Sequence, residues 1–281
     1  VYMVMGPLVG AGGGVRTEWG AGGGGGGGKG GGGGVSGSGG GARAEPGGTV
    51  LRPGRHEPVS LSRLAAKRIV AGQPAHELSD TFAVLRTRVL KQLADHGFST
   101  LMVVSPNPGE GKSTVAANLA VSIAKLSEYG VLLIDTDLRR PSVHALFHIT
   151  QTPGLTDYLT GDATAEACLV DPGIPRLMLL PAGRAVAHSA ELLSNARLGR
   201  LVHELTAGGH NRVVVVDGPP ILASDDAIVL AGHVDCGLLV AAEARTPKAD
   251  VDSAFKLLPG LPFVGTVLNR SRDKQHRYDR S

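Results

Sequence analysis

Six short apolar runs alternate with segments of helical periodicity between residues 100 and 269. The runs are TLMVV, VLLID, LMLLP, RVVVVD, GLLVAA and FVGTVLN. Because each is apolar at consecutive positions, both faces of each strand should be buried, as in parallel sheets. Parallel neighbours need a crossover connection, which is usually a helix. The sequence therefore predicts an α/β fold with a doubly wound, mostly parallel sheet and helices on both faces.

Helical stripes precede and separate these strands. Apolar residues recur every three or four positions over residues 60–72, 79–97, 112–127, 190–209 and 246–258, so we expect a helix in each. Ser60 is a candidate N-cap, and Gly97 is a candidate helix end. Ligands of such sheets bind beyond the carboxyl ends of the strands, which is where we look for a site.

The N-terminal part of the chain has a different composition. Of the 42 glycines, 25 lie between Gly6 and Gly54. Glycine buries no side chain and loses the most backbone freedom on ordering. We therefore expect residues 1–58 to form a disordered, Gly-rich, low-complexity segment. A folded domain should span residues 59–270, followed by a flexible basic tail over residues 271–281 that we interpret, together with Arg270, as a solvated end.

Composition excludes several classes of protein. Cys168 and Cys236 cannot form a disulfide framework, and we expect both in the core. The net charge of +3 is too small to indicate nucleic-acid binding. No run approaches about 18 apolar residues, so we expect no membrane span and a cytoplasmic protein. His144 and His148 lie four residues apart among apolar neighbours, which favours helix packing over a metal site.

One stretch, SPNPGEGKST at residues 105–114, has the pattern of a phosphate-binding loop (P-loop). It follows a predicted strand and precedes a predicted helix, which is the context that this motif requires. The glycines let backbone N–H groups point inward, the lysine reaches the β and γ phosphates, and Ser113 can ligate Mg²⁺. The alternative is a plain strand-to-helix turn, and Pro106 departs from the usual first glycine. The candidate nucleotide contacts are Pro108, Gly109, Glu110, Gly111, Lys112, Ser113 and Thr114.

Acidic residues follow two of the predicted strands. Asp135 and Asp137 come after VLLI, and Asp217 comes after VVVV. Such carboxylates can be turn residues, but here they converge on the edge where the phosphates would lie, and Mg²⁺ prefers carboxylates, water and phosphate oxygens. We expect Asp217 and Asp135 around the metal, and Asp137 to orient or deprotonate an attacking hydroxyl, although these roles could be exchanged.

Together these motifs resemble the bacterial tyrosine kinases of exopolysaccharide and capsule synthesis. The resemblance covers residues 78–269: SPNPGEGKST is similar to their Walker A motif, VLLIDTDLRRPSVHALF to Walker A′ and VVVVDGPPILASDDAIVL to Walker B. It implies a P-loop fold, ATP and Mg²⁺ as cofactors, and autophosphorylation on tyrosine with Lys112, Asp135 and Asp137 as catalytic residues. The related partition and septum-site ATPases suggest that Asn269 lies near the adenine, although a strand-end turn is an equal interpretation.

The resemblance also implies partners. It suggests control of polysaccharide polymerisation and export with a separate membrane-bound co-polymerase, which would recruit this protein to the inner face of the plasma membrane. It also suggests a homo-oligomer, but Asp80, Ala83 and Arg86 stand where the family has a glutamate and two arginines, which makes the usual ring doubtful. Tyr278 in the tail is the candidate phosphoacceptor.

Two other functions fit the same motifs. A partition-type ATPase switch would hydrolyse ATP without forming a phosphoprotein. A non-catalytic adaptor of the polysaccharide machinery would bind ATP and do neither. Many partition-type relatives carry a lysine five residues before the P-loop lysine, and Asn107 at that position favours the kinase.

Overall fold

The computed structural model describes residues 2–4, 52–73, 76–206 and 211–271. Within these ranges nine strands form one sheet, in the order β1-β9-β8-β3-β7-β4-β6-β5-β2. Their bounds are β1 (Tyr2–Val4), β2 (Arg55–His56), β3 (Thr100–Ser105), β4 (Gly130–Asp135), β5 (Val170–Asp171), β6 (Leu177–Leu180), β7 (Arg212–Pro220), β8 (Cys236–Ala242) and β9 (Phe263–Asn269).

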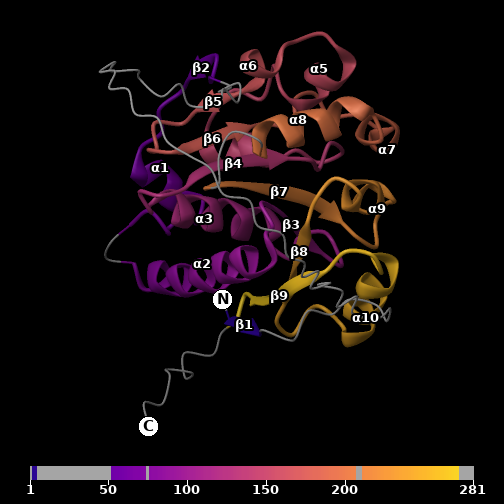
Figure 1. The fold of residues 1–281 in the computed structure, drawn as a ribbon. Helices are drawn as coiled ribbons and strands as arrows, with labels where there is room; N and C mark the ends of the chain where they lie inside the picture. The colour runs from indigo at the N-terminus through magenta and orange to yellow at the C-terminus, as the bar shows by residue number, and fades with distance from the viewer. Residues whose placement is uncertain (1, 5–51, 74–75, 207–210, 272–281) are drawn as a thin grey trace, which may run out of the picture.

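The six central strands, from β9 across to β6, run parallel to one another. β7 lies between β3 and β4, so the chain that leaves β3 passes over β7 before it returns as β4 (Figure 1). Among the described strands, antiparallel pairs occur only toward the margins, where β1 meets β9 and β5 meets β6. This topology confirms the predicted doubly wound, mostly parallel sheet.

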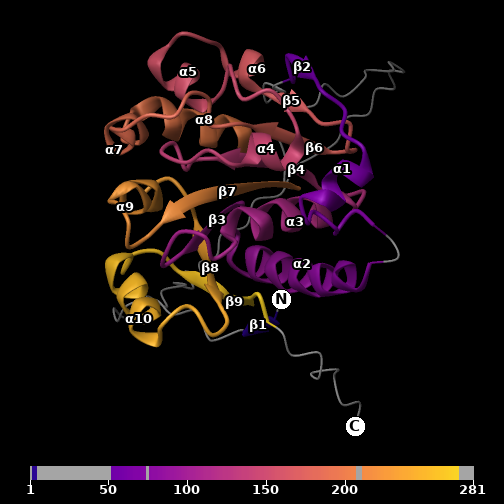
Figure 2. The same cartoon turned by 180° about the vertical axis from the view of Figure 1, so that it is seen from behind.

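Ten helices accompany the sheet in the described ranges. Their bounds are α1 (Leu61–Ala66), α2 (Glu77–His96), α3 (Lys112–Ala124), α4 (Val143–Phe147), α5 (Leu155–Thr160), α6 (Ala165–Cys168), α7 (Ser189–Leu193), α8 (Ala196–Thr206), α9 (Asp226–Ala231) and α10 (Lys248–Leu257). α2 packs beside α3, as Figure 1 and the reverse view in Figure 2 both show. None of these helices combines the length and apolar character that a membrane span requires.

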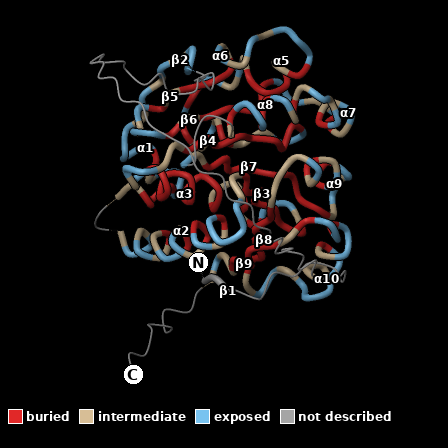
Figure 3. The backbone as a smooth tube through the Cα atoms, in the orientation of Figure 1, coloured by how far each residue is buried: buried red, intermediate tan, exposed pale blue. Residues whose placement is uncertain are grey.

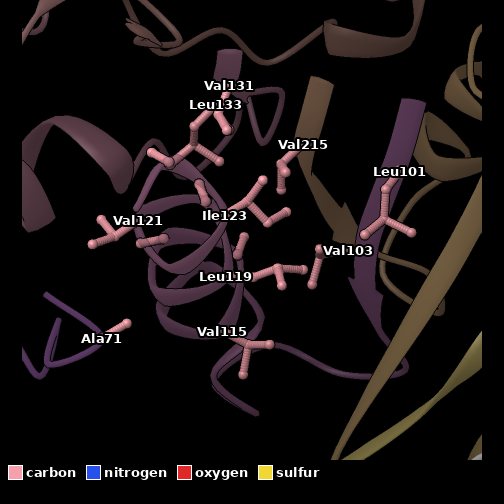
Figure 4. Close-up of a cluster of buried hydrophobic side chains, with 14 of the residues drawn as sticks. Ala71, Leu101, Val103, Val115, Leu119, Val121, Ile123, Val131, Leu133 and Val215 are labelled. Carbon is pink, nitrogen blue, oxygen red and sulfur yellow. The ribbon is translucent and has the colours of Figure 1, made fainter. Parts of the chain in front are cut away.

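Alternate residues of the strands supply two hydrophobic cores. In β3, Leu101 and Val103 join the core beneath α2 and α3, whereas Met102 and Val104 join the core beneath α8, α9 and α10. The red tube in Figure 3 shows this burial running through the central strands of the sheet. α3 packs on the first core with Leu119 and Ile123, which lie toward the strands in Figure 4. Cys168 and Cys236 are buried, as predicted.

Two predicted helices differ from the observed ones. The helix predicted over residues 190–209 is divided into α7 and α8, because Asn195 interrupts it: its side chain accepts a hydrogen bond from the N–H of Arg197. The helix predicted over residues 60–72 begins after its predicted cap, Ser60, but ends at Ala66. Arg68 beyond it has a φ of 62°, so the chain turns away from the helix.

Residues 52–58 lie before the predicted domain boundary, and in the structure they pack against the sheet. β2 pairs with β5, and the Arg55 guanidinium donates to the carbonyls of Thr152 and Pro153 over 3.1 and 2.9 Å. Because this contact is polar, the sequence contains no apolar periodicity that would predict it. Residues 5–51, which hold most of the predicted Gly-rich segment, lie outside the described residues.

Asn118 of α3 anchors the segment that follows α1, residues 68–71, to the core. Its Oδ1 accepts hydrogen bonds from the N–H groups of Val70 and Ala71 over 2.8 and 3.0 Å. Its Nδ2 donates to the carbonyls of Arg68 and Thr114 over 2.9 and 2.8 Å. The side chain is fully buried, so water cannot replace these partners when it is removed.

We therefore expect Asn118→Ala to lower the free energy of unfolding by about 3 kcal/mol, because it leaves buried backbone groups without partners. Urea denaturation of the nucleotide-free protein measures this. Ser122→Ala on the same helix is the matched control: the Ser122 hydroxyl makes one hydrogen bond, to the carbonyl of Phe82, and its loss should cost about 1 kcal/mol. Equal losses in the two variants would contradict the anchoring role.

Candidate functional site

The phosphate loop connects the end of β3 to the start of α3. Gly109 and Gly111 have φ angles of 77° and 97°, in the left-handed region that side chains with a Cβ rarely adopt. Gly111 is also the N-cap of α3, so the unpaired N–H groups of the first helical turn open onto the loop. A backbone of this shape is suited to bind anionic oxygens.

Lys112 begins α3, and its side chain lies among the carboxylates of Asp137, just after β4, and Asp217, within β7. Its Nζ is 2.9 Å from Oδ2 of Asp137 and 3.6 Å from Oδ1 of Asp217. Asp135 lies opposite Asp217 in the register of the two strands. The structure thus brings the P-loop lysine and all three predicted aspartates together at the carboxyl edge of the sheet, toward which the arrowhead of β7 points in Figure 1.

Burial and mutual charge set the protonation of this cluster. Burial, and then the charge of Asp217, raises the pKa of Asp135 to about 7, although backbone N–H groups oppose the shift. Burial also raises the pKa of Asp217, against the effect of Lys112. For Lys112, burial lowers the pKa, but Asp217 and Asp137 more than offset it, so its pKa is raised and the ammonium stays charged.

Asp135 organises the loop that follows β4. Its Oδ2 accepts hydrogen bonds from the N–H groups of Ser142 and Val143 over 2.8 and 2.9 Å, and its Oδ1 accepts one from Asp137 over 3.2 Å. These three bonds fold residues 136–143 around the carboxylate and place the Asp137 side chain beside Lys112. Asp135 therefore determines the conformation of this loop and also contributes a negative charge to the site.

The cluster fits a hydrated Mg²⁺ ion. Oδ1 of Asp217 is buried and has no hydrogen-bond partner among the described residues, which is costly unless a ligand uses it. The Ser113 hydroxyl lies nearby, 3.3 Å from Nζ of Lys112. A carboxylate oxygen and a hydroxyl are, with water and phosphate oxygens, the kinds of ligand that Mg²⁺ prefers.

Glu110 fastens the loop to two neighbouring segments. Its buried carboxylate accepts a hydrogen bond from the Thr246 hydroxyl over 2.6 Å and one from the Asn107 N–H over 3.1 Å. The Asn107 amide in turn donates to Asp250 over 2.7 Å. Thr246 and Asp250 were not predicted as part of the site, because they lie more than 130 positions away along the chain.

Asn269 contacts the phosphate loop directly. Its Nδ2 donates to the carbonyl of Glu110 over 2.9 Å, and a Cβ at position 111 would collide with the same amide. The φ angle favours glycine at position 111, and any side chain there would also have to displace the Asn269 amide. Pro108 lies at the exposed tip of the loop, Thr114 is half-buried on the first turn of α3, and Tyr278 lies outside the described residues.

A second charged cluster adjoins the site. Nε of Arg139 donates to the Ser189 hydroxyl over 2.8 Å and to Oδ2 of Asp226 over 3.2 Å. Ser189 also donates to Asp226 over 2.7 Å, and this carboxylate is fully buried. Arg139 lies two positions after Asp137 in the sequence, but nothing in the sequence marks Ser189 or Asp226.

Comparison with known proteins gives a consistent result. The sequence profile described as "CobQ/CobB/MinD/ParA nucleotide binding domain" matches residues 101–279. The chain is 34% identical over 217 residues to "Tyrosine-protein kinase YwqD" of Bacillus subtilis, covering 76% of this chain and 90% of that protein. It is 30% identical over 213 residues to "Putative tyrosine-protein kinase CapB" of Staphylococcus aureus, covering 74% and 92%.

The fold has close counterparts among solved structures. The kinase domain of Escherichia coli tyrosine kinase ETK superposes with a TM-score of 0.66 at 28% identity, covering 79% of this chain and 93% of that one. The residues matched by the sequence profile contain the phosphate loop, the three aspartates and Asn269.

Proposed function

We propose, from the premise that this chain belongs to the bacterial tyrosine-protein kinases within the CobQ/CobB/MinD/ParA nucleotide-binding family, that it transfers the γ-phosphoryl group of ATP to tyrosine hydroxyls. One observation carries the proposal: Lys112 and Asp137 form a buried ion pair beside the glycine-containing phosphate loop. The pair combines a cation for the transferred phosphate with a carboxylate that can accept a proton.

Lys112 has a defined role in this reaction. Its ammonium is charged and buried, so it neutralises the phosphate oxygens of ATP in a region that water screens poorly. To do so it exchanges part of its contact with Asp137 for contact with the phosphates. The backbone N–H groups around Gly109 and Gly111 hold the same oxygens and need no reorganisation.

Asp137 becomes the proton acceptor. The tyrosine oxygen forms a bond to the γ-phosphorus as the bond between that phosphorus and the β–γ bridging oxygen breaks, and the hydroxyl proton passes to Asp137. ADP and phosphotyrosine result. Asp217, Asp135 and Ser113 would hold Mg²⁺, which supplies positive charge to the phosphates when bound. Asp135 keeps the loop that carries Asp137 folded.

Two of the three tyrosines in the described ranges, Tyr129 and Tyr158, are poor acceptors; the third, Tyr2, lies in β1. Tyr129 packs against the first core beside the start of β4, at the opposite edge of the sheet from Lys112. Tyr158 packs on the second core, with the Arg197 guanidinium 4.9 Å from the centre of its ring. These contacts favour an acceptor in the tail, and we propose Tyr278, reached by a neighbouring copy of the chain.

Tyr278→Phe should therefore remove most of the phosphotyrosine that the purified protein forms with ATP and Mg²⁺. Phenylalanine lacks the oxygen that accepts the phosphoryl group, and the tail carries no other tyrosine. Phosphopeptide mass spectrometry measures this, with Tyr158→Phe as the matched control that should keep at least about 80% of the label. Unchanged labelling of Tyr278→Phe would exclude this acceptor.

We further propose the cellular setting that the resemblance implies. The protein would regulate polymerisation and export of an exopolysaccharide or capsular polysaccharide from the cytoplasm. A separate membrane-bound co-polymerase would recruit it to the inner face of the plasma membrane. Co-purification with such a protein from detergent extracts, in preference to an unrelated membrane protein, tests this setting.

Mass spectrometry of the wild-type protein after incubation with ATP and Mg²⁺ tests the kinase itself. Phosphotyrosine that disappears when Mg²⁺ is chelated supports it. ATP hydrolysis without phosphotyrosine, on this chain or on an added tyrosine polymer, would indicate a partition-type switch instead. Nucleotide binding with neither product would indicate an adaptor.

A further inference from the structure

The chain turns sharply where it leaves β9, and this turn lies against the phosphate loop. Arg270 follows the last residue of β9 and has a φ of 62°, a conformation that costs energy for a residue with a Cβ. Its Nη2 donates a hydrogen bond to the carbonyl of Gly109 over 2.6 Å. A strained residue thus reaches back to the exposed part of the loop.

Asn269 makes the same kind of contact one peptide further on, to the carbonyl of Glu110. The C=O and the N–H of a trans peptide point in opposite directions. When the carbonyls of Gly109 and Glu110 are held toward the end of β9, the N–H groups of Glu110 and Gly111 must face the other side. Donors on that side are free for a phosphate oxygen.

We infer that Arg270 is a positioning residue of the nucleotide site: it holds the peptide between Gly109 and Glu110 so that its N–H stays available to a nucleotide phosphate. This inference rests on the proposed function, because it requires a nucleotide in the loop. Arg270 acts through the backbone and takes no part in proton transfer. Nothing in the sequence distinguishes Arg270 from the basic tail.

Arg245 distinguishes this role from a general effect of charge. A Cβ at Gly109 would lie 3.7 Å from Nη2 of Arg245, so this second guanidinium is also close to the loop. Within the described residues, the Arg245 side chain makes no hydrogen bond to a loop carbonyl. If Arg270 acted only through its positive charge, Arg245 would contribute about as much.

The test compares affinities of the full-length chain for a fluorescent ADP analogue with Mg²⁺. We expect Arg270→Gln to weaken binding roughly fivefold, because the shorter neutral side chain cannot hold the carbonyl. Arg270→Lys should recover part of the loss. Arg245→Gln, which removes one charge and no loop contact, should change the affinity less than about twofold.

Arg270→Gly is the control that separates a loss of nucleotide affinity from misfolding. Glycine adopts a φ of 62° without strain, so the nucleotide-free variant should keep its thermal unfolding midpoint while it binds the analogue as weakly as Arg270→Gln does. Binding within twofold of wild type by both variants, or an equal loss in Arg245→Gln, would overturn the positioning role alone. Absence of binding by the wild-type protein would overturn the proposed function as well.

Discussion

Lys112→Met should reduce phosphotyrosine formation about a thousandfold. The substitution removes the only side-chain cation that lies within 4 Å of Asp137 and Asp217 among the described residues. The negative charge that develops on the transferred phosphoryl group would then lose a preorganised counter-charge in a region poorly screened by water, and losses of this size are typical of such groups. Quantitative anti-phosphotyrosine blotting over a time course measures the rate.

The same variant should also bind ATP more weakly, since the two carboxylates would face the phosphates unopposed. Lys125→Met is the matched control: this lysine follows the last residue of α3 and is exposed to solvent, so labelling should stay within about twofold of wild type. Labelling of Lys112→Met within tenfold of wild type would show that the P-loop lysine is not the catalytic cation.

Asp217→Asn should abolish the effect of Mg²⁺ on nucleotide binding and lower phosphotyrosine formation at least about a hundredfold. The carboxylate has a buried oxygen with no hydrogen-bond partner among the described residues, and an amide is a much weaker ligand for Mg²⁺. Titration of a fluorescent ADP analogue with and without Mg²⁺ separates the two effects. Asp137→Asn is the contrasting variant, and it should lose labelling but keep Mg²⁺-dependent binding.

The nucleotide-free Asp217→Asn protein should unfold at a higher urea concentration than wild type. Burial raises the pKa of Asp217, so the charged form of this carboxyl is disfavoured in the folded protein. At any pH above the pKa that Asp217 has in the unfolded chain, this lowers the free energy of unfolding. A neutral amide avoids that cost, by about 1 kcal/mol for each pKa unit of the shift. The gain should therefore be larger at pH 8 than at pH 5, and a loss of stability at pH 8 would contradict this interpretation.

The central strands of the fold could be predicted because each one is an uninterrupted run of apolar residues in the sequence. All six central strands were predicted, since each is an apolar run whose alternate residues face the two cores. The short peripheral elements α5, α6 and β5 were not, because six, four and two residues are too few to show a periodicity in the sequence. The single helix predicted over residues 190–209 missed a break that one asparagine side chain imposes.

The same distinction applies to the site. The three aspartates follow apolar strand runs in the sequence, and Lys112 belongs to a loop motif that follows another, so their convergence can be predicted from parallel pairing and the motif. Thr246, Asp250 and Arg270 reach the phosphate loop only through the order of β3, β8 and β9 across the sheet, which a sequence without a fold does not specify. Arg270 was taken for a solvated residue because its neighbours in the tail are polar and basic.

The margins of the sheet bear on how copies of this chain can associate. Both outermost strands, β1 and β2, come from the first 56 residues, and they are three and two residues long. An outer strand so short exposes few unpaired backbone groups, so it is a poor template for a strand from another molecule. Side-by-side growth of the sheet into fibrils is thereby discouraged at both ends, and any assembly of subunits should be built from helical surfaces and loops.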